Sequence, residues 1–227
     1  MALSVTQIYN MALSQLGVDK QVNPNDGSKE WKICSTWYDA TRREMLCQFP
    51  WDFARITVPL SQTANTPPMN WLFQYAIPSD CLRMLRLLVP HNDRPRNRER
   101  IPYESAAAIN TDGSTSNIIN CNCPFPVLEY VQDVQDLSRW GSDALIGLAL
   151  SLAAKIGMAL TVEPQLVKSV ADAARGAIAQ AAANSMSEGF EGPEPEREFI
   201  SCRQAGFLHH HIPGASWYPN APGFVVD

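Results

Sequence analysis

The spacing of apolar residues predicts two amphipathic helices near the start of the chain. The first runs from about Ser4, a residue type that caps helix N-termini, to Gly17, a residue type that follows helix C-termini. Its apolar positions recur every three or four residues; they are Val5, Ile8, Tyr9, Ala12, Leu13 and Leu16. The second helix begins near Ser28 and ends at Pro50. One side of it carries Trp31, Cys34, Tyr38, Thr41 and Met45.

Between residues 55 and 133 the helical period is replaced by short strand-like runs, namely ITVPL, WLFQYAI, LRMLRLLV and VLEYVQDV. Helical periodicity returns at 137–160 and at 163–185. The last helix carries a stripe of mostly small side chains that another helix can approach closely, from within the fold or from a neighbouring subunit; its members are Leu166, Val170, Ala174, Ala177 and Ala181. The sequence therefore predicts a mainly α protein, with a helical bundle domain at 1–54 and 134–186 and a small β-rich insertion at 55–133.

The remaining segment, 187–227, predicts an extended C-terminal docking arm. Five prolines and five glycines interrupt it, yet it holds six of the chain's twenty aromatic residues. Such side chains need a groove, either on another protein or on the arm's own domain. The acidic stretch 188–198 is interpreted as a hinge. The predicted anchors are Phe207, Trp217, Tyr218, Phe224 and Val225.

Composition narrows the function classes. The net charge of −5 argues against a protein that coats nucleic acid. The start MALSVTQIYN shows no secretory signal, so the six cysteines are expected to be reduced thiols. The apolar segment 144–160 contains Lys155 and is shorter than the roughly 20 residues of a membrane span, so it predicts a buried helix and no membrane partner.

The sequence offers no convincing catalytic, cofactor or metal site. It contains neither a G-x-S-x-G nucleophile motif nor a phosphate-binding glycine loop. His209, His210 and His211 are consecutive, so on an extended arm they point in alternating directions. Cys121 and Cys123 form a C-x-C pair without a second pair to complete a zinc site. We therefore predict a non-enzyme without cofactor or metal.

One local basic feature departs from the acidic average: Arg94, Arg96, Arg98 and Arg100 alternate, and in an extended conformation all four would project to one side. This pattern is typical of a solvated hairpin tip, of a ridge that docks on an acidic partner, or of a contact with the DNA backbone. The acidic Asp93 and Glu99 beside it favour a protein partner over DNA.

Several segments resemble the head-to-tail adaptor proteins of short-tailed bacteriophages, the tail tubular protein A family, and they occur in that family's order. They are 9–17 (YNMALSQLG), 40–46 (ATRREML), 50–54 (PWDFA), 73–83 (FQYAIPSDCLR) and the helix at 144–160. Together they span roughly residues 5–185. The longer C-terminal arm and the Arg-rich segment depart from the simplest members of the family.

The resemblance implies a structural protein of the phage virion, assembled in the host cytoplasm. Twelve copies would form a ring that joins the portal protein to the tail nozzle, which resembles tail tubular protein B, with tail fibres as further partners. DNA would pass through its lumen without sequence-specific binding, and the C-terminal arm would lodge between portal subunits. A ring also needs two different subunit surfaces, for which Trp37, Arg42 and the alanine stripe are candidates. The alternative hypotheses are a tail-associated hydrolase and a cytosolic helical scaffold.

Overall fold

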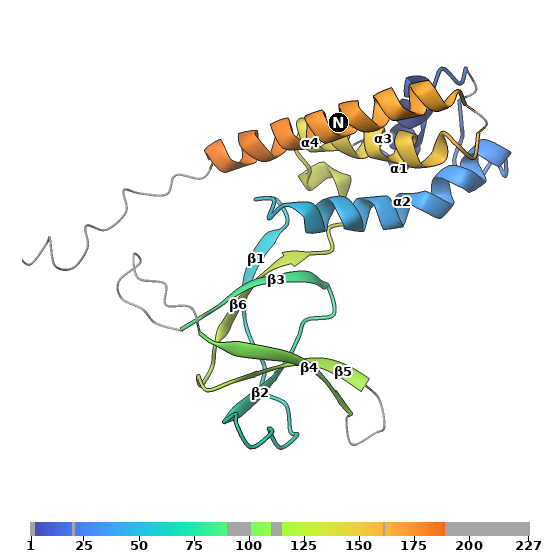
Figure 1. Ribbon diagram of the computed structural model, residues 1–227. Helices are drawn as coiled ribbons and strands as arrows, with labels where there is room; N and C mark the ends of the chain where they lie inside the picture. Colours follow the sequence, from blue (N-terminus) through green and yellow to red (C-terminus); the bar gives the residue numbers. More distant parts are fainter. Residues whose placement is uncertain (1–2, 20, 90–100, 110–114, 161, 189–227) are drawn as a thin grey trace, which may run out of the picture. The chain divides into compact units, whose positions relative to one another are not determined.

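A computed structural model describes residues 3–19, 21–89, 101–109, 115–160 and 162–188. The chain divides into two compact units, residues 1–190 and 191–227, and all described elements belong to the first (Figure 1). Its helices are α1 (Val5–Gln15), α2 (Lys29–Gln48), the short 3₁₀ helix η1 (Leu137–Arg139), α3 (Ser142–Ile156) and α4 (Pro164–Glu188). Its strands are β1 (Arg55–Pro59), β2 (Phe73–Ala76), β3 (Cys81–Leu88), β4 (Tyr103–Ile109), β5 (Thr115–Cys121) and β6 (Val127–Gln132).

Local capping fixes the ends of the first two helices where the sequence predicts them. At α1, the Ser4 side chain accepts from the backbone N–H of Gln7, and the Gln7 Oε1 accepts from the backbone N–H of Ser4 at 2.7 Å. Gly17 follows with a φ of +69°, a conformation that favours glycine. At α2, the Ser28 hydroxyl accepts from the N–H of Trp31 at 3.1 Å.

Helix α3 is the centre of the helical core, since it packs against α1, α2 and α4. Contact with α4 is close at Gly147, where an added Cβ would lie 3.1 Å from Ile178 Cγ1. The stripe of α4 faces the core at Val170, Ala174 and Ala181, which are buried. The alanine stripe therefore serves a contact within the fold.

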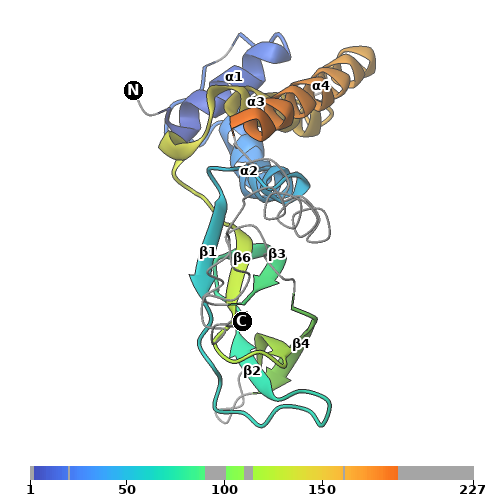
Figure 2. The ribbon, with the colours of Figure 1, turned by 90° about the vertical axis from the view of Figure 1, so that its left-hand side faces the viewer.

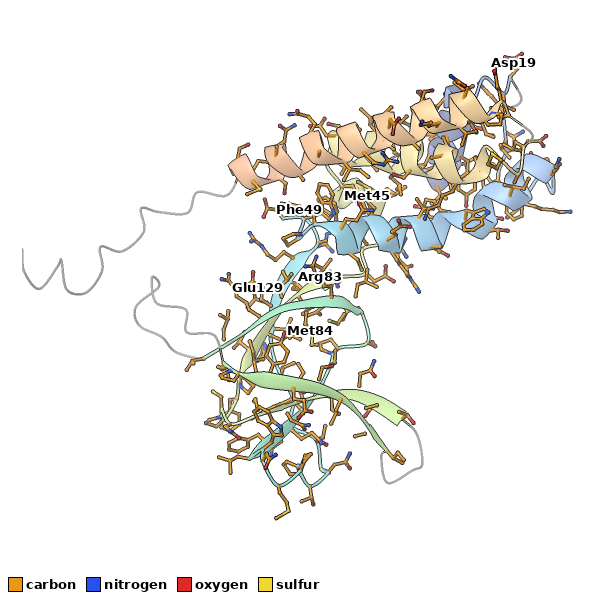
Figure 3. The ribbon with its side chains drawn as sticks, viewed as in Figure 1. Asp19, Met45, Phe49, Arg83, Met84 and Glu129 are labelled. Carbon is orange, nitrogen blue, oxygen red and sulfur yellow. The ribbon has the colours of Figure 1, made fainter. Side chains whose placement is uncertain are left out.

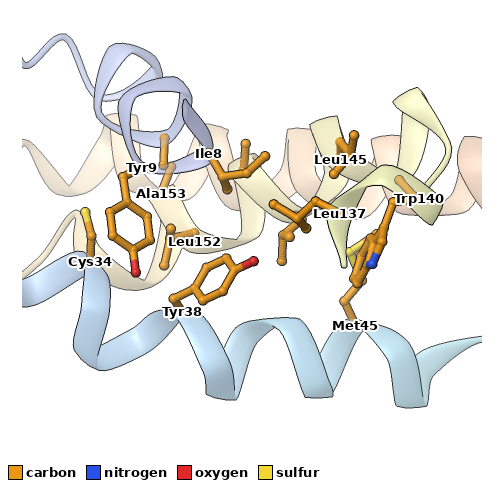
Figure 4. Packing of buried hydrophobic residues seen from close by; sticks show 14 of the residues in the cluster. Ile8, Tyr9, Cys34, Tyr38, Met45, Leu137, Trp140, Leu145, Leu152 and Ala153 are labelled. Atoms are coloured by element: carbon orange, nitrogen blue, oxygen red, sulfur yellow. The ribbon is translucent and has the colours of Figure 1, made fainter. Parts of the chain in front are cut away.

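Two tyrosines and a thiol meet between α1 and α2 (Figure 4). The rings of Tyr9 and Tyr38 lie edge to face with centroids 5.5 Å apart, and Cys34 is fully buried. Burial raises the pKa of Tyr9 to about 12, with the charge of Tyr38 adding to the effect, and it likewise raises the pKa of Tyr38 to about 12. Both hydroxyls are thus held in the neutral form.

This cluster predicts a loss of stability in alkali. The folded pKa values lie above the ordinary tyrosine value of 10.0, so their contribution is fully present below pH 10 and is lost as pH rises from 10 to 12. Urea unfolding at a series of pH values should show this fall, and Tyr38→Phe should make it shallower. A free energy of unfolding that stays constant up to pH 12 would contradict the assignment.

The six strands form two three-stranded antiparallel sheets that share one apolar core. The first has the order β1-β6-β3 and the second β2-β5-β4 (Figure 2). Residues of both sheets contribute to the core, which includes Leu60, Tyr75, Leu87, Ile119, Cys121, Leu128 and Tyr130.

Hydrogen bonds beyond the strand ends connect the two sheets on both sides. After β1, the chain continues beside β2, with the N–H of Thr63 donating to Gln74 O at 2.9 Å. Before β4, the N–H of Ile101 donates to Leu87 O of β3 at 3.2 Å. These bonds pair part of the backbone at the sheet edges and so link the two sheets.

The prediction of a mainly α protein is wrong: two antiparallel sheets accompany four α-helices in the described residues, which makes the fold mixed α/β. All described strands fall within 55–133, but β4 and β5 were not predicted. The single helix expected at 137–160 is also divided, because the chain leaves η1 at Trp140 and Gly141 before α3 begins.

Candidate functional site

The residues that the sequence singled out for docking lie outside the described residues. These are the arm anchors Phe207, Trp217, Tyr218, Phe224 and Val225 and the ridge of Arg94, Arg96, Arg98 and Arg100. They stay predictions. The histidines at 209–211, which the sequence did not support as a metal site, lie outside the described residues as well. Three candidate features lie within the described residues: a charged joint between α2 and the sheets, a surface pocket, and an apolar surface.

The charged joint centres on Arg42, which is 1% exposed although it lies on α2. Its Nη1 donates to Asp133 Oδ1 and, at 3.0 Å, to the backbone oxygen of Val134. The neighbouring Arg43 places its Nε 3.2 Å from the other oxygen of Asp133. Because a buried charge must be paired, this arrangement ties α2 to the segment that follows β6. Arg42 is therefore an internal residue and unsuited to a subunit contact.

A second set of bonds, around Asp80, joins β3 to β6. Its Oδ1 accepts from the Tyr130 hydroxyl at 3.0 Å, and its Oδ2 accepts from Gln132 Nε2 at 2.8 Å. The backbone oxygen of Asp80 also accepts from the N–H of Asp133 at 2.8 Å. Burial, together with the bond to Asp80, raises the pKa of Tyr130 to about 12. The backbone oxygen of Asp80 therefore helps to place Asp133 beside Arg42, and its carboxylate holds the end of β6 at Tyr130 and Gln132.

Strand β3 also contacts the end of α2 directly. The Nη1 of Arg83 donates to the backbone oxygen of Cys47, in the last turn of the helix, at 2.8 Å. Further along the sheet lies Glu129, labelled in Figure 3, which is 3% exposed. It is paired with Arg86 and, at 3.8 Å, with Arg55. Arg42 belongs to one of the segments that carry the family resemblance, 40–46, and Asp80 and Arg83 belong to another, 73–83, so two of those segments meet in this joint.

A surface pocket of about 270 Å³ lies where the exit of α2, the start of α3 and the end of α4 meet. Trp51, Phe53 and Trp140 contribute aromatic walls, and Glu188, the last described residue, lies at its edge. The Trp51 Nε1 donates to Met45 O at 2.9 Å. The Trp140 Nε1 is buried and has no acceptor among the described residues. Sequence reasoning missed this pocket, although the segment PWDFA that forms one wall was noticed.

The loops at one end of the sheet β2-β5-β4 present apolar side chains to solvent. Phe125 is 74% exposed and Leu72 is 69% exposed. Phe125 also has a φ of 52°, a left-handed backbone conformation that is uncommon for a bulky residue. The buried Tyr75 hydroxyl fixes this loop, because it accepts from the Phe125 N–H at 3.0 Å and donates to Cys123 O at 3.1 Å. The Leu72 N–H donates to Asn122 Oδ1 at 3.0 Å. The exposed apolar residues are thus held in place by hydrogen bonds.

This apolar surface is also poor in charge. The sequence between Arg55 and Asp80 contains no charged residue, and the sequence between Glu104 and Glu129 contains only Asp112. Depletion of charge with exposed Met and aromatic residues is typical of the core of a protein–protein interface. Met69, in the same loop as Leu72, is fully exposed.

The thiols show no catalytic or metal-binding arrangement in the described part of the chain. Five cysteines there are free, and no group of three or more His, Cys, Asp or Glu side chains is placed to hold a metal ion. Burial raises the pKa of both Cys121 and Cys123 above the ordinary thiol value, which disfavours the reactive thiolate.

In comparisons with known proteins, no protein-family model matches the chain and no curated protein matches it. Among the described residues, no helix is both long enough and apolar enough to cross a membrane.

Proposed function

We propose that this protein is a structural head-to-tail adaptor of a phage virion, which forms a ring between the portal and the tail nozzle. The observation that carries the proposal is the order of the family-like segments together with their convergence on one joint. Arg42 lies in one of these segments and Asp80 and Arg83 lie in another further along the chain, yet together they connect α2 with β3 and β6. Buried ion pairs and hydrogen bonds limit movement between the elements that they join.

A rigid joint suits an adaptor, because force during DNA packaging and ejection would pass through it without changing the shape of each subunit. The ring form would continue the DNA channel, and the protein would be assembled in the host cytoplasm and retained in the virion. The apolar surface around Leu72 and Phe125 is suited to contact the tail.

The arm is assigned to the portal. Its aromatic anchors, Trp217, Tyr218 and Phe224 foremost, would fill crevices between portal subunits, and Pro219 and Pro222 would reduce the entropy lost on binding. This assignment distinguishes the adaptor from a cytosolic scaffold, whose arm would cover its own domain.

The test is binding of the purified full chain to portal rings of the same virion. We expect a complex that contains a ring of this protein, visible by electron microscopy, and loss of binding when residues 187–227 are deleted. A triple variant with Trp217, Tyr218 and Phe224 replaced by Ala should weaken binding in the same direction. Binding that is absent for the full chain, or unchanged by the deletion, contradicts the proposal.

A further inference from the structure

The pocket at the end of α4 carries an excess of negative charge. Asp52 is matched by Arg55, with 2.7 Å between their charged atoms. Asp143 instead accepts from an amide, the Nδ2 of Asn184. Neither Asp143 nor Glu188 forms an ion pair with any residue that the structure describes. Two carboxylates in the pocket thus have no cationic side chain paired with them.

Among the described residues, the pocket lining contains one cation, Arg139, and its donors are already engaged. Arg139 donates from Nη1 to Gln132 Oε1 at 3.2 Å and from Nη2 to the Phe53 backbone oxygen at 2.9 Å. These bonds hold its guanidinium on neutral oxygens, so it is not paired with either carboxylate. The pocket therefore favours a cationic ligand on electrostatic grounds.

The walls of the pocket indicate the kind of cation. Phe53, which is partly buried, offers aromatic surface next to the carboxylates, while Trp51 and Trp140 also line the pocket but are almost fully buried. An aromatic face beside carboxylates suits the planar guanidinium of arginine better than a lysine ammonium. Trp140 is 5% exposed, and its Nε1 donor has no acceptor in the described part of the chain. A peptide that carries arginine also brings backbone carbonyl oxygens, which can accept from such a donor once the indole adjusts.

The chain itself contains a segment of this chemistry. Four of its eighteen Lys and Arg residues lie within seven positions, at Arg94, Arg96, Arg98 and Arg100. The segment connects β3 to β4 and lies outside the described residues. In a protein with a net charge of −5, this is the densest positive stretch, and the pocket is a site of negative excess.

We propose that the pocket binds the arginine segment 94–100 of a second copy of this chain. The two surfaces differ, so the contact is head-to-tail and each copy can be both donor and acceptor of an arginine segment. The inference rests on the proposed function only for the claim that successive contacts close into a ring. The proposed contact provides an acidic protein partner for the arginine ridge, and the sequence favours such a partner over DNA.

Peptide binding tests the pocket. The receptor is the full chain with Arg94, Arg96, Arg98 and Arg100 replaced by Gln, so that its own segment cannot compete. The probe is a synthetic peptide of residues 90–101 with blocked ends, titrated by calorimetry at low salt. We expect binding, and a shift of the Trp140 indole N–H signal in the NMR spectrum.

Paired variants make the pocket test specific. Asp143→Asn combined with Glu188→Gln should weaken peptide binding about tenfold, because two charge-assisted contacts are lost. Asp172→Asn removes one charge from the exposed face of α4, outside the pocket, and should change binding less than twofold. Absence of binding, or equal weakening by both changes, would overturn the assignment of the pocket.

Self-association tests the second copy. Sedimentation of the unaltered chain should show assemblies that grow with concentration and dissociate at high salt. Reversing the charge of the pocket, with Asp143→Lys and Glu188→Lys, should abolish these assemblies. Mixing this variant with a chain that has Gln at the four arginine positions should restore only mixed dimers, because only one complementary contact is then left.

The outcomes separate the inference from the proposed function. A chain that stays monomeric at every concentration while the peptide binds would place the segment in its own pocket and would overturn the proposal of a second copy. Self-association through the pocket, without binding to portal rings, would leave the inference intact and contradict the adaptor function.

Discussion

Arg42→Met is expected to lower the free energy of unfolding by about 3 to 5 kcal/mol, the usual cost of removing one partner of a buried ion pair. The substitution keeps most of the apolar stem but leaves Asp133, which is only 12% exposed at its side chain, with Arg43 as its remaining cation. It also removes the donor to the backbone oxygen of Val134. Urea unfolding followed by circular dichroism measures the change.

Two further variants serve as controls for Arg42→Met. Arg175→Met changes an arginine that is 79% exposed at its side chain and pairs with Asp172 on the surface, so it should cost less than about 1 kcal/mol. Replacing Arg42 and Asp133 together by apolar residues should cost less than the sum of the single changes, because no unpaired charge stays behind. A loss below about 1 kcal/mol for Arg42→Met would show that the joint contributes little to stability.

Trp51→Ala is expected to cost about 3 to 5 kcal/mol, as large aromatic residues do when they are removed from a core. Trp51 is 1% exposed, and its ring lies between Phe49 and Phe53, with centroids at 5.2 Å and 5.8 Å. Its Nε1 donates to the last turns of α2, at Met45 O. The loss would open a cavity and also leave that carbonyl oxygen without this donor.

A second tryptophan, which lies on α2 itself, provides the control for Trp51→Ala. Trp37, on α2, is 43% exposed, so Trp37→Ala should cost less than about 1 kcal/mol in the isolated chain. Its exposure keeps it available as a subunit contact, and the same variant can be tested for an effect on self-association. Equal losses for the two tryptophans would contradict the packing described for Trp51.

The helices could be predicted from the sequence because their signals are local. Ser4 and Ser28 are capping residues next to periodic apolar positions, and both cap a helix in the structure. The interruption at Trp140 and Gly141 was not predicted, although the polar and glycine residues Gly141, Ser142 and Asp143 interrupt the apolar pattern there and are a local signal for a break.

The predicted fold class was wrong because the sequence did not predict two of the strands, β4 and β5. Strand β4 contains Ala106, Ala107 and Ala108, residues that favour helices, and β5 contains Asn117 and Asn120, which are depleted in strands. Pairing between these two strands, and the burial of Ile118 and Ile119 in the shared core, override the local preference.

The charged joint could not be predicted from the sequence either. Asp133 was noticed only as the end of a strand-like run, and its partner Arg42 lies 91 positions away. Arg42 was considered for the outer surface because a charged residue on a helix is usually exposed. By contrast, the absence of charge between Arg55 and Asp80 can be read directly from the sequence and would have indicated the apolar surface near Leu72.

The position of α3 in the helical core has a consequence for synthesis of the chain. Helices α1 and α2 pack on a helix that begins at Ser142, whereas α2 already ends at Gln48. At ribosomal rates of roughly 5–20 residues per second, their apolar faces wait about 5–20 s for their partner. The strands become complete before α3 does, so the sheets can fold first while the leading helices stay exposed to chaperones.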